Sequence, residues 1–312
     1  MLRHPRTGVT VCLAVAAVLA LAACVAPSSP AGTAGTAGSG ASSEATLSTS
    51  STGELTVAIA GMVTPDEGLE YYQALSAYVA RKAGLRLRLF HKAEYAEVNT
   101  MLEQRKVDMA FVCSGPYVTG HDSFGLELLA APQIGGAPVY YSYIIVPAKS
   151  TVSSLEGLRG KTFAFTDPES NTGKTVPTYL VSKMGSTPEA FFSRTFLTYS
   201  HDNSIKAVAT GAADGAAVDS LIWEYANAHS PQYTSQTKVI LKSEPFAVPP
   251  VVVPPSLDPA LKTRLRDALL HAHEDPEGRA ILDKMGIERF VMVEDSAYDS
   301  IRAMNAWIAG RK

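Results

Sequence analysis

The alternation of short apolar runs with segments of helical periodicity is the feature that most constrains this fold. Residues 55–60 have the pattern of a buried strand, and Leu69, Tyr72, Leu75 and Val79 then fall on one face of a helix. Further strand-like runs occur at residues 85–89, 107–112, 141–146, 162–166, 195–199, 215–218 and 239–241, with helical segments between most of them. This alternation predicts an α/β protein with mainly parallel sheets and right-handed crossovers.

Polar residues follow the ends of several predicted strands. They are Tyr95, Ser114, Ser170, His201 and Asp219. Ligands in open α/β sheets bind outside the carboxyl ends of the strands, so we expect these side chains to contribute to one site.

The N-terminus has the pattern of a secretory signal. Arg3 and Arg6 precede a mostly apolar stretch at 9–20, which is too short for a stable membrane-spanning helix. The sequence Leu-Ala-Ala-Cys at 21–24 resembles a bacterial lipobox, which predicts a signal peptide at 1–23 and a lipid on Cys24. An ordinary secreted protein with an incidental cysteine is the alternative. Residues 24–52 are rich in Ala, Ser, Thr, Gly and Pro and predict a disordered tether.

Charge and cysteine content narrow the class of protein. The chain has 27 basic and 30 acidic residues, and loss of Arg3 and Arg6 with the signal leaves a net charge near −5. This balance does not suggest a nucleic-acid partner. With Cys12 removed and Cys24 lipidated, Cys113 has no disulfide partner, and its apolar context predicts a small buried residue instead of a nucleophile.

The segment 163–177 carries the most specific chemistry. It is predicted to run from a strand into a turn of Ser170, Asn171 and Thr172, and then into a helix. Free N–H groups at a helix start bind anions, and neighbouring hydroxyls add donors. The Gly-Lys-Thr at 173–175 suggests a P-loop, but that motif needs a glycine where Pro168 stands, and proline has no N–H to offer a phosphate.

The same segment resembles a family signature. Asp-Pro-Glu-Ser-Asn-Thr-Gly at 167–173 is similar to the Asp-Pro-x-Ser-Thr-Ser-Gly of the phosphonate and phosphite solute-binding proteins of ABC importers. The Tyr-Ser-His-Asp-Asn segment at 199–203 resembles the family's Gly-His region. Glu-Tyr at 94–95 and Tyr-Tyr-Ser at 140–142 resemble its Asp-Tyr and Tyr-Trp-Ser.

The resemblance implies a two-lobed type II periplasmic binding protein with a hinge between two mainly parallel sheets. Lobe 1 is expected at 53–141 plus 247–312 and lobe 2 at 142–246. The implied ligand is a small phosphorus oxyanion, and the implied partners are an ABC permease and its ATPase. The resemblance implies a monomer, anchored outside the cytoplasm by its lipid, that is not an enzyme and needs no cofactor or metal. The implied ligand-binding residues are Tyr95, Tyr140, Ser170, Asn171, Thr172, Gly173 and His201.

Three departures and ambiguities bear on the ligand. Asn171 replaces the usual Thr and adds a carbonyl that would repel an anion if turned toward it. Leu221 and Pro249 align with acidic residues that meet the amine of aminoalkylphosphonates, so a small ligand without an amine is favoured, such as phosphite, a short alkylphosphonate or phosphate. Asp219 either accepts a hydrogen bond from a P–OH group or caps the helix that follows it.

Other functions remain as alternatives. Ser170, His201 and Asp219 are the residue types of a hydrolase triad, but the chain lacks a Gly-x-Ser-x-Gly elbow and the order is unfamiliar. A lipoprotein of the same fold could instead present its ligand to a sensor. His271, His273, Glu274 and Asp275 resemble a metal cluster on paper, yet they lie at a predicted helix end, where a surface role is favoured.

Overall fold

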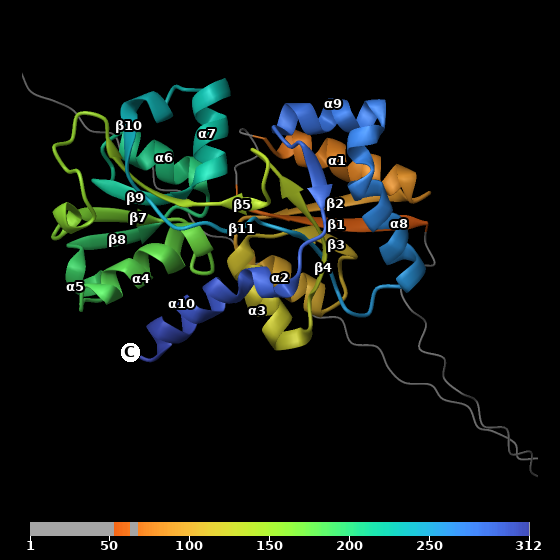
Figure 1. Ribbon diagram of the computed structural model, residues 1–312, viewed down its shortest axis with the longest axis horizontal. Helices are drawn as coiled ribbons and strands as arrows, with labels where there is room; N and C mark the ends of the chain where they lie inside the picture. Colours follow the sequence, from red (N-terminus) through yellow and green to blue (C-terminus); the bar gives the residue numbers. More distant parts are fainter. Residues whose placement is uncertain (1–52, 63–67, 312) are drawn as a thin grey trace, which may run out of the picture. The chain divides into compact units, whose positions relative to one another are not determined.

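The structure is a computed structural model that describes residues 53–62 and 68–311 (Figure 1). The predicted signal peptide 1–23, the lipidation site Cys24 and the tether 24–52 lie outside the described residues. Within those residues, no helix combines the length and apolar character needed to cross a bilayer.

The first sheet has six strands in the order β13-β4-β12-β3-β1-β2. The strand at 86–92 has the alternation that its sequence predicts, because Arg86 and Arg88 are exposed while Leu87 and Leu89 pack on the core. Figure 1 shows α1 and α9 on one face of this sheet and α2 and α3 on the other. The strands are β1 (Glu54–Ala60), β2 (Arg86–Lys92), β3 (Met109–Phe111), β4 (Glu127–Gln133), β12 (Val251–Val253) and β13 (Arg289–Val291), and the helices are α1 (Leu69–Lys82), α2 (Tyr95–Glu103), α3 (Ser114–Phe124), α8 (Pro259–Leu270), α9 (Pro276–Met285) and α10 (Asp299–Ala309).

The second sheet has five strands in the order β10-β6-β9-β7-β8. Phe163 and Phe165 of β7 point to the cluster that includes Val181 and Phe191, whereas Ala164 packs with Ile205 on the opposite face. This two-residue alternation buries both faces, which Figure 1 shows covered by α4 and α5 on one side and α6 and α7 on the other. The strands are β6 (Ser142–Pro147), β7 (Thr162–Phe165), β8 (Arg194–Leu197), β9 (Gly215–Asp219) and β10 (Thr237–Lys242), and the helices are α4 (Val176–Lys183), α5 (Pro188–Phe191), α6 (His201–Ala209) and α7 (Ser220–His229).

The two-lobed α/β class is confirmed, but the sheets are mixed instead of mainly parallel. Strands β1, β2 and β3 are parallel, as are β7, β8 and β9, whereas β4, β6, β10, β12 and β13 form antiparallel pairs. Between the sheets, β5 (Val139–Tyr140) pairs antiparallel with β11 (Phe246–Ala247), where the chain leaves one lobe and returns to it. Because the chain returns in the opposite direction, β12 enters the first sheet antiparallel to both of its neighbours.

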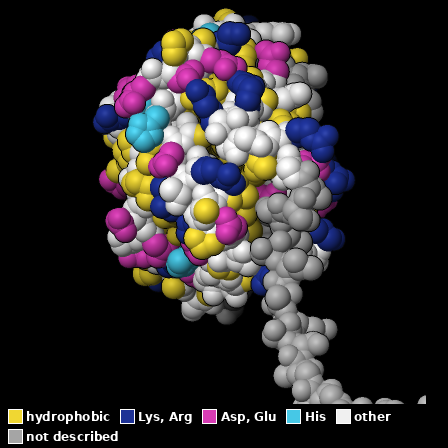
Figure 2. All heavy atoms as spheres, turned by 90° about the vertical axis from the view of Figure 1, so that its right-hand side faces the viewer, with side chains coloured by type: hydrophobic (Ala, Val, Ile, Leu, Met, Phe, Trp, Pro, Cys, Tyr) yellow, Lys and Arg dark blue, Asp and Glu magenta, His cyan; other side chains and the backbone are white. Residues whose placement is uncertain are grey.

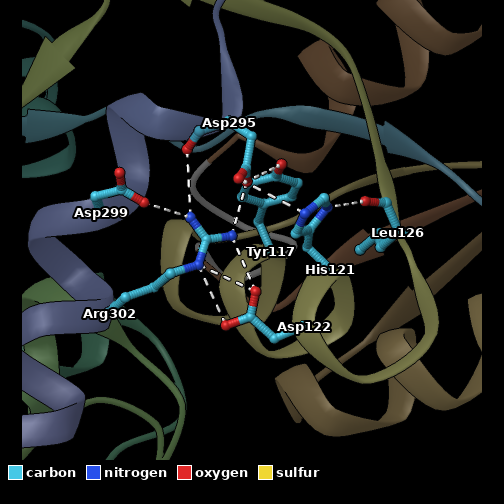
Figure 3. A network of polar contacts seen from close by, with 7 residues as sticks. All are labelled: Tyr117, His121, Asp122, Leu126, Asp295, Asp299 and Arg302. Atoms are coloured by element: carbon cyan, nitrogen blue, oxygen red, sulfur yellow. Dashed lines mark hydrogen bonds and ion pairs between the residues drawn. The ribbon is translucent and has the colours of Figure 1, made fainter.

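The C-terminal helix α10 joins the two lobes. Near its start, Arg302 bonds Asp299 of its own helix, Asp295 just before it and Asp122 of α3 (Figure 3). Further along, the Trp307 indole N–H donates to Ser182 Oγ of α4 at 3.0 Å. One helix is therefore tied to the first lobe by ion pairs and to the second by a hydrogen bond.

Charged side chains on the first lobe are of mixed sign. Figure 2, which views the molecule from the α8 side, shows acidic and basic side chains interspersed. On the first lobe, ion pairs join neighbouring elements, such as Arg81 of α1 with Glu277 of α9 and Lys82 with Asp275. Because acidic and basic side chains are interspersed, this face has no extended electrostatic potential of one sign.

Candidate functional site

The turn after β7 is built around Ser170 and Gly173. Ser170 caps a short π-helix (Asn171–Thr175), and its Oγ accepts a hydrogen bond from the Gly173 amide at 3.0 Å. A Cβ on Gly173 would lie 2.3 Å from Thr166 Oγ1, so only glycine lets this turn pack so closely on the end of β7. Gly173 therefore shapes the turn and its N–H is already used, while the Ser170 hydroxyl keeps its own proton to donate.

Asn171 and Thr172 present buried polar atoms at the start of this turn. Asn171 Nδ2 donates to Tyr140 Oη at 3.1 Å, and Tyr140 therefore retains its phenolic proton for another acceptor. Asn171 Oδ1 and Thr172 Oγ1 are buried without a hydrogen-bond partner. The Thr172 carbonyl accepts a hydrogen bond from Ser142 Oγ at 2.7 Å, which anchors the turn to β6.

The environment of His201 determines which of its ring nitrogens carries the proton. Burial lowers the pKa of His201 to about 3, so the imidazole is neutral. Its Nδ1 lies 3.0 Å from the backbone N–H of Asp219, which can only donate, so Nδ1 must be the acceptor. The proton is therefore on Nε2, which is buried and has no partner. His201 thus offers one fixed, uncharged N–H donor.

Asp219 ends β9 and caps α7. Its Oδ1 accepts a hydrogen bond from the Leu221 amide at 2.8 Å, so the helix-cap interpretation is confirmed. Burial raises the pKa of Asp219 to about 7 against the opposing effect of backbone hydrogen bonds from Leu221 and Ile222. Its role toward a P–OH group stays a prediction.

Tyr95 reaches the cluster from the first lobe, at the start of α2. It is fully buried, and burial raises its pKa well above the ordinary value, with smaller contributions from Cys113 and Asp167. Ser170 lies near enough to favour the ionised form slightly, but the Tyr95 hydroxyl makes no hydrogen bond of good geometry with it. Tyr95 is therefore a neutral phenol with a free donor.

Sequence reasoning missed Asp167, although it opens the motif. Its Oδ2 accepts a hydrogen bond from the Tyr95 amide at 3.2 Å, and its Oδ1 accepts one from the Glu169 amide at 2.8 Å. Asp167 thus caps α2 from the opposite lobe. The lobes also meet where Gly115 lies against Glu169, since a Cβ on Gly115 would be 2.0 Å from the Glu169 carbonyl oxygen.

Three neighbouring residues support the site. Ser114 was expected near it and Cys113 was expected to be a small buried residue, whereas Thr166 was given no role. Thr166 Oγ1 lies 3.2 Å from His201 Nδ1, and Ser114 Oγ donates to the Ala247 carbonyl at 2.7 Å. Cys113 is buried with its Sγ 3.9 Å from Tyr140 Oη, and burial raises its pKa to about 11, so it is a packing residue and not a thiolate. The sequence signal for Cys113 and Ser114 was their place after the apolar run 107–112, whereas Thr166 stood out only as the last residue of the run 162–166.

Together these residues form a cluster of buried polar groups, and the uncharged donors among them are suited to an anion. Buried polar groups almost always have partners, so free atoms on Tyr95, Thr172 and His201 indicate a ligand that supplies them. Hydrogen bonds to a charged acceptor contribute about 1.5–3 kcal/mol each, so several neutral donors can hold an oxyanion without Lys or Arg. We call Tyr95, Tyr140, Ser170, Asn171, Thr172 and His201 the oxyanion site.

The geometry does not support a hydrolase triad. In such a triad the aspartate carboxylate accepts a hydrogen bond from the Nδ1–H of the histidine. Here Nδ1 is itself an acceptor, and its partner is the backbone N–H of Asp219, not the carboxylate. Ser170 Oγ meanwhile bonds the Gly173 amide. The three residues are neighbours, but they lack the relay that would activate a serine.

The other predicted alternatives occupy ordinary structural positions. Lys174 Nζ lies 3.7 Å from the centre of the Phe165 ring. His271 Nδ1 contacts the Asp267 carbonyl, and Asp275 caps α9. In the part of the chain that the structure describes, no group of three or more His, Cys, Asp or Glu side chains is arranged to hold a metal ion.

Comparison with known proteins gives the family. The profile described as "ABC transporter, phosphonate, periplasmic substrate-binding protein" matches residues 57–298. The phosphonates-binding periplasmic protein of Escherichia coli is 26% identical over 229 residues, covering 72% of this chain and 68% of that protein. The phosphate-import protein PhnD of Mycolicibacterium smegmatis is 28% identical over 254 residues, covering 74% and 78%.

Solved structures agree on the fold. A binding protein component of an ABC phosphonate transporter from Pseudomonas aeruginosa superposes with a TM-score of 0.78 at 25% identity, covering 83% of this chain and 87% of the other. PhnD1 from Prochlorococcus marinus, solved with methylphosphonate, gives a TM-score of 0.74 at 18% identity, covering 82% and 98%. The chain therefore belongs to the family of phosphonate-type periplasmic substrate-binding proteins of ABC transporters.

Proposed function

We propose that this protein captures a small phosphorus oxyanion, namely phosphite, a short alkylphosphonate or phosphate, between its two lobes and delivers it to an ABC permease and its ATPase. The observation that carries the proposal is the set of buried, unpartnered atoms on Tyr95, Thr172 and His201. They come from both lobes, so a ligand that satisfies all of them would hold the lobes together. Lobe boundaries at 53–141 plus 247–312 and 142–246 are part of this proposal, with β5 and β11 as the hinge.

The proposal includes a lipid anchor on Cys24 and a monomeric state. Cys24 follows a signal-like segment, and the tether 24–52 would let the binding unit reach a permease in the same membrane. Metabolic labelling with a fatty acid tests the anchor. The wild-type chain should incorporate the label and sediment with membranes, and Cys24→Ser should do neither; a labelled Cys24→Ser variant would place the lipid elsewhere.

Isothermal titration of the full chain in mild detergent tests the ligand class. The panel is phosphite, methylphosphonate, 2-aminoethylphosphonate, phosphate and sulfate at neutral pH. We expect micromolar or tighter binding of at least one phosphorus oxyanion, near −8 kcal/mol. The aminated compound should bind weakly, because Leu221 and Pro249 cannot pair with an ammonium group. Tight binding of sulfate with no response to any phosphorus compound would overturn the proposal.

A further inference from the structure

A cavity of about 650 Å³ lies between the lobes beside the oxyanion site. Two of its lining residues also contact that site. The Met62 carbonyl accepts a hydrogen bond from the His201 amide at 3.1 Å, and Asp219 donates its backbone N–H to His201 Nδ1. Through these two residues the cavity borders the backbone and the Nδ1 side of His201, whereas the six residues of the oxyanion site are not among those that line it.

The part of the wall that follows Asp219 is apolar and aromatic. Leu221 and Ile222 line it from α7, and Tyr72 and Phe111 line it from the first lobe, with their rings in edge contact at 5.2 Å. Pro249 lies in the same wall. Leu221 and Pro249, which led the sequence analysis to favour a small ligand, thus border a space far larger than a phosphite ion. A volume of this size falls in the range of pockets that bind whole organic ligands.

The charges on the wall are of one sign. Glu70, Asp202, Asp219 and Glu224 are among the lining residues, whereas no Lys or Arg side chain lines the cavity within the described residues. Glu224 accepts a hydrogen bond from the Tyr143 hydroxyl, and Glu70 is exposed. A second anionic group on the ligand would meet like charges here, whereas an apolar body would meet the apolar part of the wall. An ammonium group would be attracted by these carboxylates, so the weak binding expected of 2-aminoethylphosphonate requires its amine to lie against Leu221 and Pro249 and away from Glu70 and Glu224.

We propose that the ligand is a phosphorus oxyanion with a bulky apolar substituent, of butyl or phenyl size or larger, which lies in this cavity while the oxyanion site holds the phosphorus group. This inference rests on the proposed function and refines it from the headgroup to the whole ligand. The substituent carries no second negative charge. A phosphonate and a phosphate monoester share this chemistry and differ in the bridging oxygen.

Titration of the full chain with a graded ligand series tests the inference. The series is phosphite, methyl-, propyl-, butyl- and phenylphosphonate, with phenyl phosphate to separate the ester from the phosphonate and phosphonoacetate to add a second anion. Each fully buried methylene should tighten binding about fourfold. Even partial burial should therefore make butylphosphonate bind on the order of tenfold more tightly than methylphosphonate, and phosphonoacetate should bind more weakly than propylphosphonate.

Two size-increasing substitutions on α7 localise the effect. Leu221→Trp fills the cavity and should weaken binding of butyl- and phenylphosphonate at least tenfold more than that of phosphite. Ala228→Trp adds bulk at an exposed position of the same helix that does not line the cavity, and it should leave every affinity unchanged. Thermal melts of both variants verify that they fold.

The outcomes separate the two levels of the proposal. If phosphite and methylphosphonate bind but longer or aromatic substituents bring no gain, the cavity inference is wrong and the proposed function stands. If neither the series nor inorganic phosphate binds, both are overturned. Equal losses for phosphite and butylphosphonate in Leu221→Trp would also overturn the inference, because the substitution would then act on the headgroup alone.

Discussion

The two ring nitrogens of His201 should be separable by a pair of amide substitutions. Nδ1 lies two bonds from Cβ, like the Oδ1 of asparagine, whereas Nε2 lies three bonds away, like the Nε2 of glutamine. His201→Asn should therefore keep an acceptor for the Asp219 amide and lose the donor to the ligand. His201→Gln should do the reverse. Alanine would remove both groups at once and leave the cause of any loss undecided.

The expected sizes follow from the contacts. A hydrogen bond to a charged group contributes about 1.5–3 kcal/mol, so His201→Asn should weaken methylphosphonate binding about 10- to 150-fold. His201→Gln leaves the buried Asp219 N–H without an acceptor, which costs about 1–3 kcal/mol of folding stability. A protein of this size loses about 2–4 °C of melting temperature per kcal/mol, so the Gln variant should melt several degrees lower.

Titration calorimetry and thermal melts of the ligand-free proteins measure the two effects separately. The reasoning predicts that affinity falls most in His201→Asn and that melting temperature falls most in His201→Gln. Wild-type affinity in His201→Asn would show that Nε2 makes no ligand contact. An unchanged melting temperature in His201→Gln would show that the Asp219 N–H does not depend on Nδ1, and the assignment of the proton to Nε2 would then be refuted.

Two further predictions concern charge. Asp219 has a pKa of about 7 in the folded protein and near 4 when unfolded, so its contribution to stability is present below pH 4 and is lost as the pH rises to about 7, by up to about 4 kcal/mol. Asp219→Asn keeps a capping oxygen and should make the melting temperature nearly constant between pH 5 and pH 8. A variant whose melting temperature depends on pH as in the wild type would disprove the shift. Arg302→Met leaves Asp122, Asp295 and Asp299 without their shared cation and should lower the free energy of unfolding, measured with urea, by about 1–2 kcal/mol. The loss should be smaller in high salt, which screens the ion pairs. A loss that does not depend on salt would indicate that Arg302 acts through packing and not through charge.

Local patterns in the sequence were sufficient to predict most elements but not their directions. The alternation of Leu87 and Leu89 with exposed arginines identified β2, and the apolar runs identified β1, β6, β7 and β9, because a strand's side chains face its two sides in turn. Strands β4, β5, β11, β12 and β13 were not predicted, and the sheets were expected to be mainly parallel. Strand direction depends on where the chain crosses between lobes, which is a property of distant segments.

The anion motif was likewise visible in the sequence, whereas its hydrogen-bond assignments were not. Ser170, Asn171, Thr172 and His201 were expected to bind the ligand because their segments resemble motifs of the family, and their binding role stays a prediction. That Gly173 uses its N–H internally, and that Asp167 caps α2 from the other lobe, could be decided only in three dimensions. These contacts depend on how the chain packs in space, and no local periodicity encodes them.

The sequence by itself determined that this chain contains an α/β unit with hydroxyl, amide and imidazole groups after its strands, because residue type and short-range periodicity govern local structure. Only the tertiary structure decided which atoms of those groups are free. Packing of the two lobes buries Tyr95 and His201 together, assigns the imidazole proton and places Leu221 and Pro249 in the wall of a large cavity. Burial and partner choice depend on segments that meet only on folding, which is why the free atoms could be identified only in the structure.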